Sequence, residues 1–344
     1  MSSKSAIDFI GDIHGHYDEI RALLKKLGYV ETAGTFRSPR DERTVVFLGD
    51  YVDRGPQIRE TLNLVRAMRD SGSAIALMGN HEFNMLSFWY KNGDGGRFLK
   101  NPGRGYLRKH TLNQIKGHLK TIETFAGHED EFEEVKEFAK ALPFYLETDT
   151  FCAQHASFDP EAVSVLKNAG ISCFADGNFD ELIYRANDED CEYADSLFRP
   201  IDLLLKGPEM KLPDGVSFVD KDGKRRTSAR IRWWVDPTRA DLTELSMEPL
   251  DEKYKSSAVP DEVRRRYFHG EDERSVFFGH YWLKGKPQLL RRNVCCLDYS
   301  VAAGGCLACY RFDGEQQLDA IKLVWVKQIT KVKNASSLVP ENRR

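Results

Sequence analysis

One arrangement of hydrophobic and polar positions occurs three times before residue 91. Each time, a strand-length apolar run leads into a short polar loop, and a segment with apolar residues at helical spacing follows. The apolar runs are residues 6–10, 43–48 and 74–78, and the helical segments are residues 17–27, 58–68 and 84–90. Three consecutive strand-loop-helix units predict an α/β fold whose strands are largely parallel.

The three polar loops have related sequences: GDIHG, GDYVDRGP and GNHE. Taken singly, such residues are more often helix caps, turn residues or surface ion pairs than ligands. Ligands of open α/β sheets, however, bind at the carboxyl ends of the strands, where all three loops are expected. The candidate side chains that could meet there are Asp12, His14, Asp50, Asp53, Arg54, Asn80 and His81.

Two further histidines follow predicted strands later in the chain. Residues 150–154 lead directly into His155, and residues 275–278 lead into a glycine and His280. Each histidine alone would more often be a satisfied core residue than a ligand. Because both stand at the end of a predicted strand, we expect them to reach the same crevice as the three loops.

The C-terminal part of the chain is expected to be mainly β-structure. Runs with strand character occur at residues 294–297, 307–312 and 321–326. Asp313 and Gly314 are typical of a turn, so the last two runs predict a hairpin. Cys306 and Cys309 form a single CxxC sequence within strand-like flanks, and we interpret them as buried thiols rather than zinc ligands.

Composition limits the class of protein. The chain has 344 residues, 41% of them hydrophobic, which is enough for a sizeable core. Fifty Lys and Arg against 53 Asp and Glu give a formal net charge of -3, which argues against a global attraction to nucleic acid or to anionic membranes. Seven cysteines without regular spacing favour a reducing compartment. With no apolar run near the roughly 20 residues of a membrane helix and no room for a secretory signal, we expect a soluble, cytoplasmic protein.

Carboxylate, amide and imidazole groups from several loops are typical of a two-metal hydrolase, with Mn expected first and Fe or Zn as alternatives. In an extended chain, Asp12 and His14 would project to the same side, whereas the neighbours Asn80 and His81 would project oppositely. Asp50 is placed to bridge two divalent ions about 3.5–4 Å apart. Hydroxide held between these ions is the expected nucleophile.

The remaining loop residues suit the handling of a phosphate group. Arg54 offers a planar fork of donors for phosphate oxygens. His81 is the candidate general acid for the leaving oxygen, and Asp53 is the carboxylate that would orient its ring. This scheme requires no serine or cysteine nucleophile.

Five motifs in order carry a family resemblance: GDIHG, GDYVDRGP, GNHE, the histidine of AQHAS and the Gly-His of FFGHY. Together, over residues 11–280, they resemble the signature of the calcineurin-like metallophosphoesterases. The similarity is closest to the branch of phosphoprotein phosphatases, which includes serine/threonine protein phosphatases, and symmetric diadenosine tetraphosphatases. It implies two packed β-sheets flanked by helices, with a dinuclear metal site at the strand ends.

The resemblance also implies roles for the site residues. His81 and Asp53 would form the acid dyad, and Arg54 would bind the substrate phosphate. Two divalent metal ions would be bound by each chain. One ion would be held by Asp12, His14 and Asp50, and the other by Asp50, Asn80, His155 and His280.

Two features of the sequence point to different substrates. The run FFGHYWLKGKPQ and the segment after it are more similar to dinucleotide polyphosphatases, although Tyr281 stands where Thr or Trp is usual. Asp53, in contrast, is present as in the phosphoprotein phosphatases, and the dinucleotide enzymes often lack it. The motifs therefore leave the choice between these substrates open.

A long segment without family motifs separates His155 from His280. We interpret residues 184–261 as a substrate-specificity insert within a single domain of residues 1–330, followed by a polar tail at 331–344. Asp222 and Gly223 predict a hairpin with basic arms in this insert. Arg185, Arg230 and Arg232 are candidates for a second phosphate contact, although ordinary surface arginines would look the same.

The function predicted first is a metal-dependent phosphatase of phosphate monoesters, with a phosphoprotein or phosphopeptide as substrate. The alternative is a hydrolase of nucleotides or dinucleotide polyphosphates such as diadenosine tetraphosphate, or a phosphatase of nucleic-acid ends. A third reading, a catalytically dead binding module, is disfavoured because no chemistry-bearing position is lost. The expected partner is thus a phosphorylated substrate; nucleic acid is not favoured, and no membrane is expected.

Overall fold

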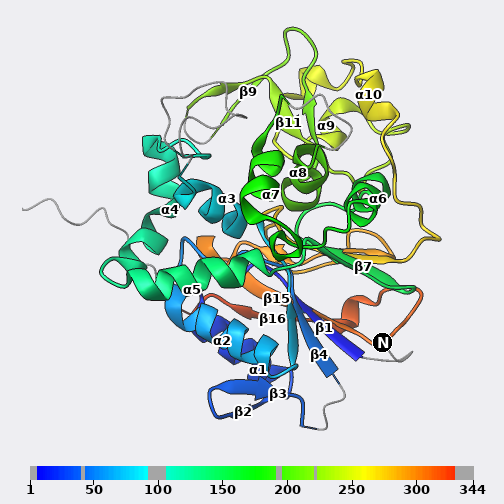
Figure 1. Cartoon of the computed structure of the whole chain (residues 1–344). Helices are drawn as coiled ribbons and strands as arrows, with labels where there is room; N and C mark the ends of the chain where they lie inside the picture. The colour runs from blue at the N-terminus through cyan, green and yellow to red at the C-terminus, as the bar shows by residue number, and fades with distance from the viewer. Residues whose placement is uncertain (1–5, 40–42, 92–105, 191–195, 221–222, 330–344) are drawn as a thin grey trace, which may run out of the picture.

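Two β-sheets stacked face to face form the centre of the molecule (Figure 1). The computed structural model describes residues 6–39, 43–91, 106–190, 196–220 and 223–329. The six-stranded sheet contains β1 (Ala6–Ile10), β4 (Arg43–Phe47), β5 (Ala74–Ala76), β14 (Asp298–Tyr299), β15 (Cys306–Phe312) and β16 (Leu323–Lys327). The four-stranded sheet contains β6 (Tyr145–Glu147), β7 (Phe151–Gln154), β12 (Ser275–Phe278) and β13 (Val294–Cys296).

The strand directions follow the repeated units of the sequence. β1 pairs with β4 and β4 with β5, in both cases parallel. In the second sheet, β12 is parallel to both β7 and β13, while β6 is antiparallel to β7. β15 is antiparallel to β1, and it pairs with β14 and β16. The hairpin predicted at Asp313 and Gly314 is confirmed by the antiparallel β15–β16 pair.

Aromatic side chains fill the space between the two sheets. Phe9 of β1 stacks on Phe277 of β12, with ring centroids 3.8 Å apart and an interplanar angle of 10°. Phe151 of β7 meets Phe9 edge to face at 5.1 Å. Because side chains alternate along a strand, Phe9 faces this inner layer while its neighbour Ile10 packs with the helices. The second sheet, which only the family resemblance had implied, is confirmed.

Truncating Phe9 should therefore destabilise the whole fold. We expect Phe9→Ala to lower the free energy of unfolding by about 3–5 kcal/mol, because a large cavity would open between the sheets. Urea denaturation measures the change. Leu112→Ala is the matched control, since this residue is 67% exposed, and its effect should stay within about 0.5 kcal/mol. If the two substitutions changed the free energy of unfolding equally, Phe9 would not be a central part of the core between the sheets.

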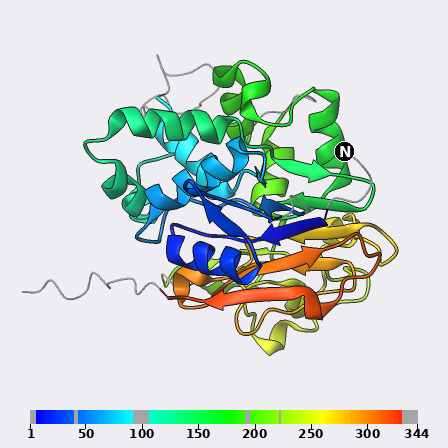
Figure 2. The same cartoon turned by 90° about the horizontal axis from the view of Figure 1, so that it is seen from below.

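Helices cover the sheets on both sides (Figures 1 and 2). α1 packs on β15 and β16, and α2 packs on β5, while α6 and α7 each pack on α8. No helix in the described ranges is both long and apolar enough to cross a membrane. The longer helices are α1 (Tyr17–Lys26), α2 (Ile58–Asp70), α3 (Asn80–Trp89), α4 (Leu112–Phe125), α5 (Glu129–Lys140), α6 (Pro160–Asn168), α7 (Phe179–Asn187) and α8 (Phe198–Lys206).

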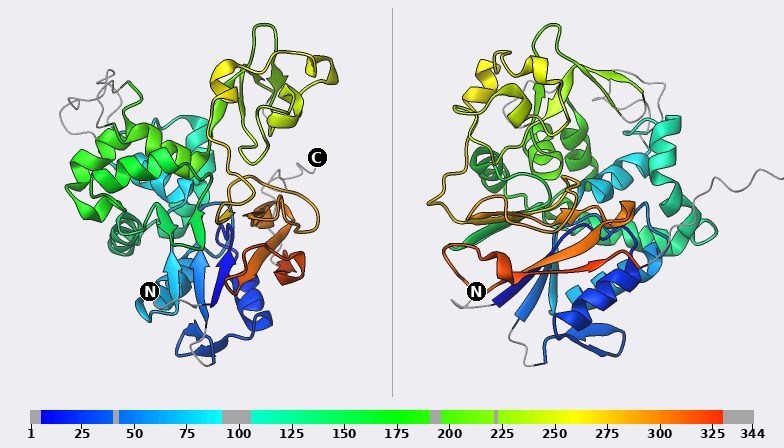
Figure 3. Two further views of the ribbon diagram at one scale, coloured as in Figure 1. Left: turned by 90° about the vertical axis from the view of Figure 1, so that its right-hand side faces the viewer. Right: turned by 180° about the vertical axis from the view of Figure 1, so that it is seen from behind.

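A small lobe with its own apolar cluster projects beyond the sheets, in yellow and green in Figure 3. It contains the strand pairs β8 (Glu209–Lys211) with β11 (Ser228–Arg230) and β9 (Phe218–Val219) with β10 (Arg225–Arg226), and the short helices α9 (Leu242–Leu245) and α10 (Asp261–Arg264). A further hairpin, β2 (Val30–Thr32) with β3 (Thr35–Arg37), follows α1.

The lobe overlaps the segment interpreted as an insert. β9 and β10 flank the predicted turn at Asp222 and Gly223, although Asp222 lies outside the described residues. The tail at 331–344 also lies outside them. The division into one domain of residues 1–330 with an insert at 184–261 stays a prediction.

Candidate metal centre

Five strand ends meet at one edge of the two sheets. Asp12, Asp50 and Asn80 follow β1, β4 and β5, and His155 and His280 follow β7 and β12. The connecting loops are tied together by hydrogen bonds: Gly279 N–H donates to the carbonyl oxygen of His155 (2.8 Å), and His155 Nδ1 lies 2.8 Å from the carbonyl oxygen of Leu48. The structure thus brings all five residues into one cluster, although they come from two sheets.

The loops that carry Asp12 and Asp50 are sharply bent. His14 (φ 47°) and Asp50 (φ 58°) adopt left-handed backbone conformations. His14 N–H donates to the carbonyl oxygen of Asp50 (2.8 Å), and Gly15 N–H donates to that of Tyr51 (3.0 Å). The expectation of an extended stretch from Asp12 to His14 is therefore wrong. Hydrogen bonds between two loops that are distant in sequence impose the turn.

Asn80 and His81 are not extended either, because they are the first two residues of α3. At 3.6 residues per turn, neighbouring helical side chains diverge by about 100°, so the two residues still face different partners. Asn80 Oδ1 lies 2.9 Å from His155 Nε2 and 2.7 Å from His280 Nδ1. His81 Nδ1 instead contacts Asp53 Oδ2 at 2.5 Å.

Asp50 lies at the centre of the cluster. Its Oδ1 is 3.3 Å from His155 Nε2, and its Oδ2 is 3.4 Å from His14 Nε2. Among the described residues, two groups of side chains have ligand atoms all within 4.8 Å of one another: His14, Asp50 and His81, and Asp12, Asp50 and His155. Asp50 belongs to both groups, as a bridging ligand would. The structure groups Asp12 with His155 rather than with His14, so the division of ligands between two ions stays a prediction.

The charges in this cluster favour a bound cation. Burial, with Asp298 and Asp50 nearby, raises the pKa of Asp12 well above its usual value. Burial opposes ionisation of Asp50 as well, but His155 and His81 outweigh it and hold the pKa of Asp50 well below the usual value. Buried carboxylates in such proximity are normally paired with positive charge or bound to metal.

The histidines of the cluster differ in protonation. Burial lowers the pKa of His14 and of His280 well below the ordinary value, so both imidazoles are neutral and each has a nitrogen lone pair to offer. For His155, burial is outweighed by Asp50, which raises the pKa to about 10, so a metal ion bound there would have to displace the proton. Neutral imidazole together with carboxylate and amide oxygens is a donor set that suits Mn, Fe or Zn.

Two glycines leave room for the carboxylates. A Cβ atom on Gly79 would lie 2.2 Å from Asp50 Oδ1, and one on Gly279 would lie 2.0 Å from Asp12 Oδ1. Any other residue would push these carboxylates aside. Steric fit to the two carboxylates therefore explains why glycine stands at these positions of GNHE and FFGHY. The residues present fit a centre for divalent ions.

His81, Asp53 and Arg54 form a second arrangement beside the cluster. His81 is held by Asp53 through Nδ1, and its Nε2 lies 3.9 Å from Asp50 Oδ2 and 3.3 Å from an Nη atom of Arg54. Burial lowers the pKa of His81, but Asp50 and Asp53 outweigh it and raise the pKa overall. A proton on His81 is thereby favoured at the edge of the site.

Sequence reasoning missed two buried carboxylates that build the site. Glu82 accepts hydrogen bonds from the backbone N–H groups of Asp50, Tyr51 and Val52 at 2.8–3.1 Å. It therefore holds the sharply bent loop in place, and its position in the GNHE motif was the available signal. Asp298 accepts from Trp282 N–H (2.7 Å) behind the cluster, and the similarity of the segment after FFGHYWLKGKPQ to dinucleotide polyphosphatases was the available signal.

Of the three arginine candidates, Arg230 lies beside Trp282, as Arg54 does. Its guanidinium lies 5.6 Å from the ring centroid of Trp282, and that of Arg54 lies at the same distance. Trp282 is 44% exposed and follows His280 by two positions. Arg185 instead pairs with Glu181 of α7 (3.3 Å). In the described part of the chain, the side chain of Arg232 shows no contact with the site.

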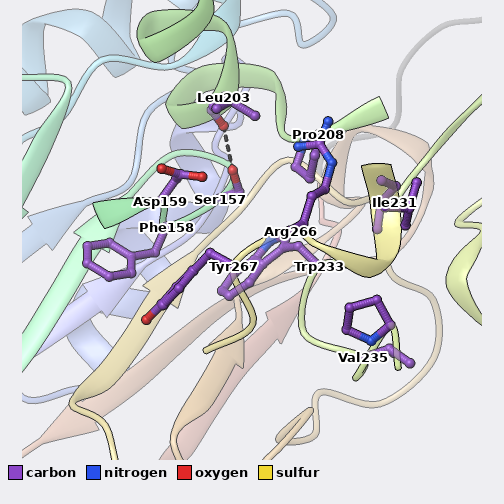
Figure 4. A pocket seen from close by; sticks show the side chains of 12 residues that line it. Ser157, Phe158, Asp159, Leu203, Pro208, Ile231, Trp233, Val235, Arg266 and Tyr267 are labelled. Carbon is purple, nitrogen blue, oxygen red and sulfur yellow. Dashed lines mark hydrogen bonds between the residues drawn. The ribbon is translucent and has the colours of Figure 1, made fainter. Parts of the chain in front are cut away.

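A small cavity lies between the segment 157–159, which follows β7, and residues from the segment 203–267 (Figure 4). Its volume is about 30 Å³, which is room for one or two water molecules and not for a substrate. Ser157 Oγ–H donates to the carbonyl oxygen of Leu203 (2.6 Å) at its wall. The other polar side chains of its lining are Asp159, Arg266 and Tyr267.

Curated relatives are similar to parts of the chain. The asymmetrical bis(5'-nucleosyl)-tetraphosphatase PrpE of Halalkalibacterium halodurans is 45% identical over 74 residues, which are 22% of this chain and 30% of that protein. PrpE of Geobacillus sp. is 47% identical over 83 residues, 24% of this chain and 34% of that protein. The symmetrical bis(5'-nucleosyl)-tetraphosphatase of Hamiltonella defensa is 31% identical over 134 residues, 34% of this chain and 42% of that protein. The chain thus matches less than half of the length of these relatives.

Solved structures are similar over nearly the whole chain at low identity. A protein serine/threonine phosphatase from Saccharomyces cerevisiae is 15% identical, with 97% of this chain and 82% of that chain covered and a TM-score of 0.47. A cold-active protein-tyrosine phosphatase of a Shewanella species is 16% identical, with 95% and 81% covered and a TM-score of 0.44.

The family model of the calcineurin-like phosphoesterases matches residues 5–281. This span begins before GDIHG and ends just after His280, so it includes every loop that supplies the cluster. The matched region therefore contains every proposed metal ligand and the strands β7 and β12, whereas Asp298 lies beyond it. The chain belongs to the calcineurin-like phosphoesterases.

Proposed function

We propose that the protein is a two-metal phosphatase of phosphate monoesters, acting on phosphorylated proteins or peptides. The observation that carries this proposal is the contact of 2.5 Å between His81 Nδ1 and Asp53 Oδ2 beside the centre. A serine or threonine alkoxide is a strongly basic leaving group, and its departure requires a proton donor in this position. A diphosphate leaving group is much less basic and needs such a donor less.

The proposed ligands are those that the family resemblance implies. Asp12, His14 and Asp50 would hold one divalent ion, and Asp50, Asn80, His155 and His280 the other, with Mn as the proposed metal. Such ions supply Lewis-acid charge neutralisation and activation of water. The position of Asp50 in both groups of close ligand atoms supports its role as the shared ligand.

The protein side chains would divide the remaining work. Arg54 presents its guanidinium at the edge of the site and would bind two phosphate oxygens at once. His81, protonated on Nε2, would donate a proton to the leaving oxygen, and Asp53 would stabilise the charged ring. Arg230 would make a further phosphate contact from the insert, and its proximity to Trp282 beside Arg54 supports this role.

Hydrolysis of dinucleoside tetraphosphates is the second candidate function. The relatives named bis(5'-nucleosyl)-tetraphosphatases support this second function. Their support is equal to the support that the pair of His81 and Asp53 gives to the first function. The exposed ring of Trp282 also lies 5.6 Å from the guanidinium of each of the two arginines that would bind phosphates. Aromatic side chains at such positions can stack on a nucleobase.

A direct comparison of substrates distinguishes the two candidates. With Mn present, we expect a higher kcat/KM for a phosphoserine peptide than for diadenosine tetraphosphate, with inorganic phosphate as the product. Chromatographic product analysis and phosphate release measure the two reactions. Asp12→Asn protein, purified in the same way, is the control for contaminating phosphatases. Faster cleavage of diadenosine tetraphosphate into nucleotides would favour the second candidate and overturn the first.

A further inference from the structure

The carboxylate of Asp53 is the junction of a buried hydrogen-bonded chain that extends away from the metal centre. Its Oδ2 contacts His81 Nδ1, and its Oδ1 contacts His118 Nδ1 (2.7 Å) of α4. Thr121, one helical turn after His118, also donates to Oδ1 through its hydroxyl (2.5 Å) and accepts from Asp53 N–H (3.0 Å). Trp89 Nε1, at the end of α3, reaches His118 Nε2 at 2.9 Å.

The donors and acceptors in this chain can be assigned from chemistry alone. An indole N–H can only donate, so His118 Nε2 accepts from Trp89 and carries no proton. The remaining proton of a neutral His118 is therefore on Nδ1, and it is donated to Asp53 Oδ1. Because His118 and Thr121 occupy Oδ1, the other oxygen of Asp53 is left for His81.

This assignment determines how the ring of His81 is presented. Asp53 Oδ2 can accept only if His81 Nδ1 carries a proton. The ring is then fixed with Nε2 toward the metal centre, where it lies 3.3 Å from an Nη atom of Arg54. A guanidinium can only donate, so Nε2 accepts in this contact, and it carries a proton for the leaving group once Arg54 turns to the substrate phosphate. Asp53 is 3% exposed and His118 5% exposed, so water cannot easily replace a lost donor. A buried carboxylate without its partners would become protonated or turn away.

We propose that His118 is a positioning residue for the reaction: it holds Asp53 as an oriented carboxylate, so that His81 presents its Nε2 proton to the leaving group. This inference rests on the proposed role of His81 as proton donor. His118 does not touch the substrate in this scheme, and it acts only through Asp53 and His81. Trp89 contributes by selecting the tautomer of His118.

The competing explanation is that His118 only fills space between α3 and α4. Its ring does pack against Phe88, with centroids 5.1 Å apart. His110 provides a matched control, because it stacks on the same Phe88 at 3.8 Å and contacts the carbonyl oxygen of Phe88 at 2.8 Å. Its contacts in the described part of the chain do not include Asp53.

The test uses the full-length, Mn-loaded protein and two substrates that differ in leaving-group basicity. His118→Phe should lower kcat for a phosphoserine peptide by roughly 10–100-fold, the usual loss when a supporting partner of a site residue is removed. Turnover of p-nitrophenyl phosphate and the Mn content should stay close to wild type. His118→Asn keeps a donor near the position of Nδ1 and should restore most of the lost activity. His110→Phe should leave the ratio of the two rates unchanged.

A double variant separates this inference from the proposed function. If His118 acts through His81, adding His118→Phe to His81→Ala should cause no further loss on the phosphoserine peptide. An additive loss, or equal losses on both substrates with His118→Phe, would overturn the positioning role while leaving His81 as the acid. If His81→Ala slows both substrates equally, the proposed role of His81 as the acid is wrong, and the inference about His118 is then wrong as well.

Discussion

Asp50→Asn should abolish phosphoesterase activity and release both metal ions. Asp50 places one oxygen 3.3 Å from His155 Nε2 and the other 3.4 Å from His14 Nε2, and it belongs to both groups of close ligand atoms. Replacing it removes the one negative charge that both ions would share. Loss of a supporting contact typically costs about 10–100-fold in activity or metal affinity, so loss of a shared ligand should exceed about 10²-fold.

The substitution is well suited to the test because asparagine tolerates the left-handed backbone of Asp50, at φ 58°. A folded but metal-free variant is therefore expected, and elemental analysis with circular dichroism checks both properties. Asp12→Asn is the control: it should remove only one ion, because Asp12 would serve only one. Chelation of the wild-type protein should likewise abolish activity, and added Mn should restore it. Retention of activity in Asp50→Asn, with Asp12→Asn inactive, would show that Asp50 is not the shared ligand.

His81→Ala should slow hydrolysis of phosphoserine or alkyl phosphates by roughly 10²–10⁴-fold, the usual contribution of a general acid. The physical reason is the basicity of the leaving oxygen. An alkoxide must be protonated as it departs, whereas p-nitrophenolate is stable as an anion. Hydrolysis of p-nitrophenyl phosphate should therefore slow much less in the same variant.

The metal content of the His81→Ala variant shows whether His81 acts as the general acid or as a metal ligand. His81 also belongs to one of the two groups whose atoms could hold an ion, together with His14 and Asp50. If His81 donates the proton, the variant keeps its metal and loses only the step that expels the leaving group. Equal losses on both substrates, accompanied by depleted metal, would place His81 in the coordination sphere and leave the proton donor unidentified.

The fold was predictable where local patterns repeat. The apolar runs before GDIHG and GDYVDRGP are strands β1 and β4, and the helices after them begin at Tyr17 and Ile58, as the spacing predicts. The parallel pairing of β1, β4 and β5 follows from the repeated unit. The second sheet was expected only because the motifs resemble a family. Three of its strands were predicted singly, but no local pattern pairs β6 and β7 with β12 and β13, which lie far later in the chain.

Local reasoning failed where backbone contacts between loops decide the conformation. Asp12 and His14 were expected to lie in an extended stretch, yet His14 adopts φ 47° because its N–H donates to the carbonyl of Asp50. Asn80 and His81 begin α3 instead of forming an extended pair. No motif marked α4, so His118 and Thr121 were not connected with Asp53, more than sixty positions earlier.

By itself, the sequence determined the family, the elements that carry each motif and the residues that gather at the strand ends. These properties follow from hydrophobic periodicity and from short motifs, which depend on neighbours along the chain. Only the tertiary structure decided which atoms face one another: Asp50 between His14 and His155, and Asp53 between His81 and His118. The reason is physical, since hydrogen bonds and charge interactions act over a few ångströms in space, whereas these partners are tens of residues apart in the chain.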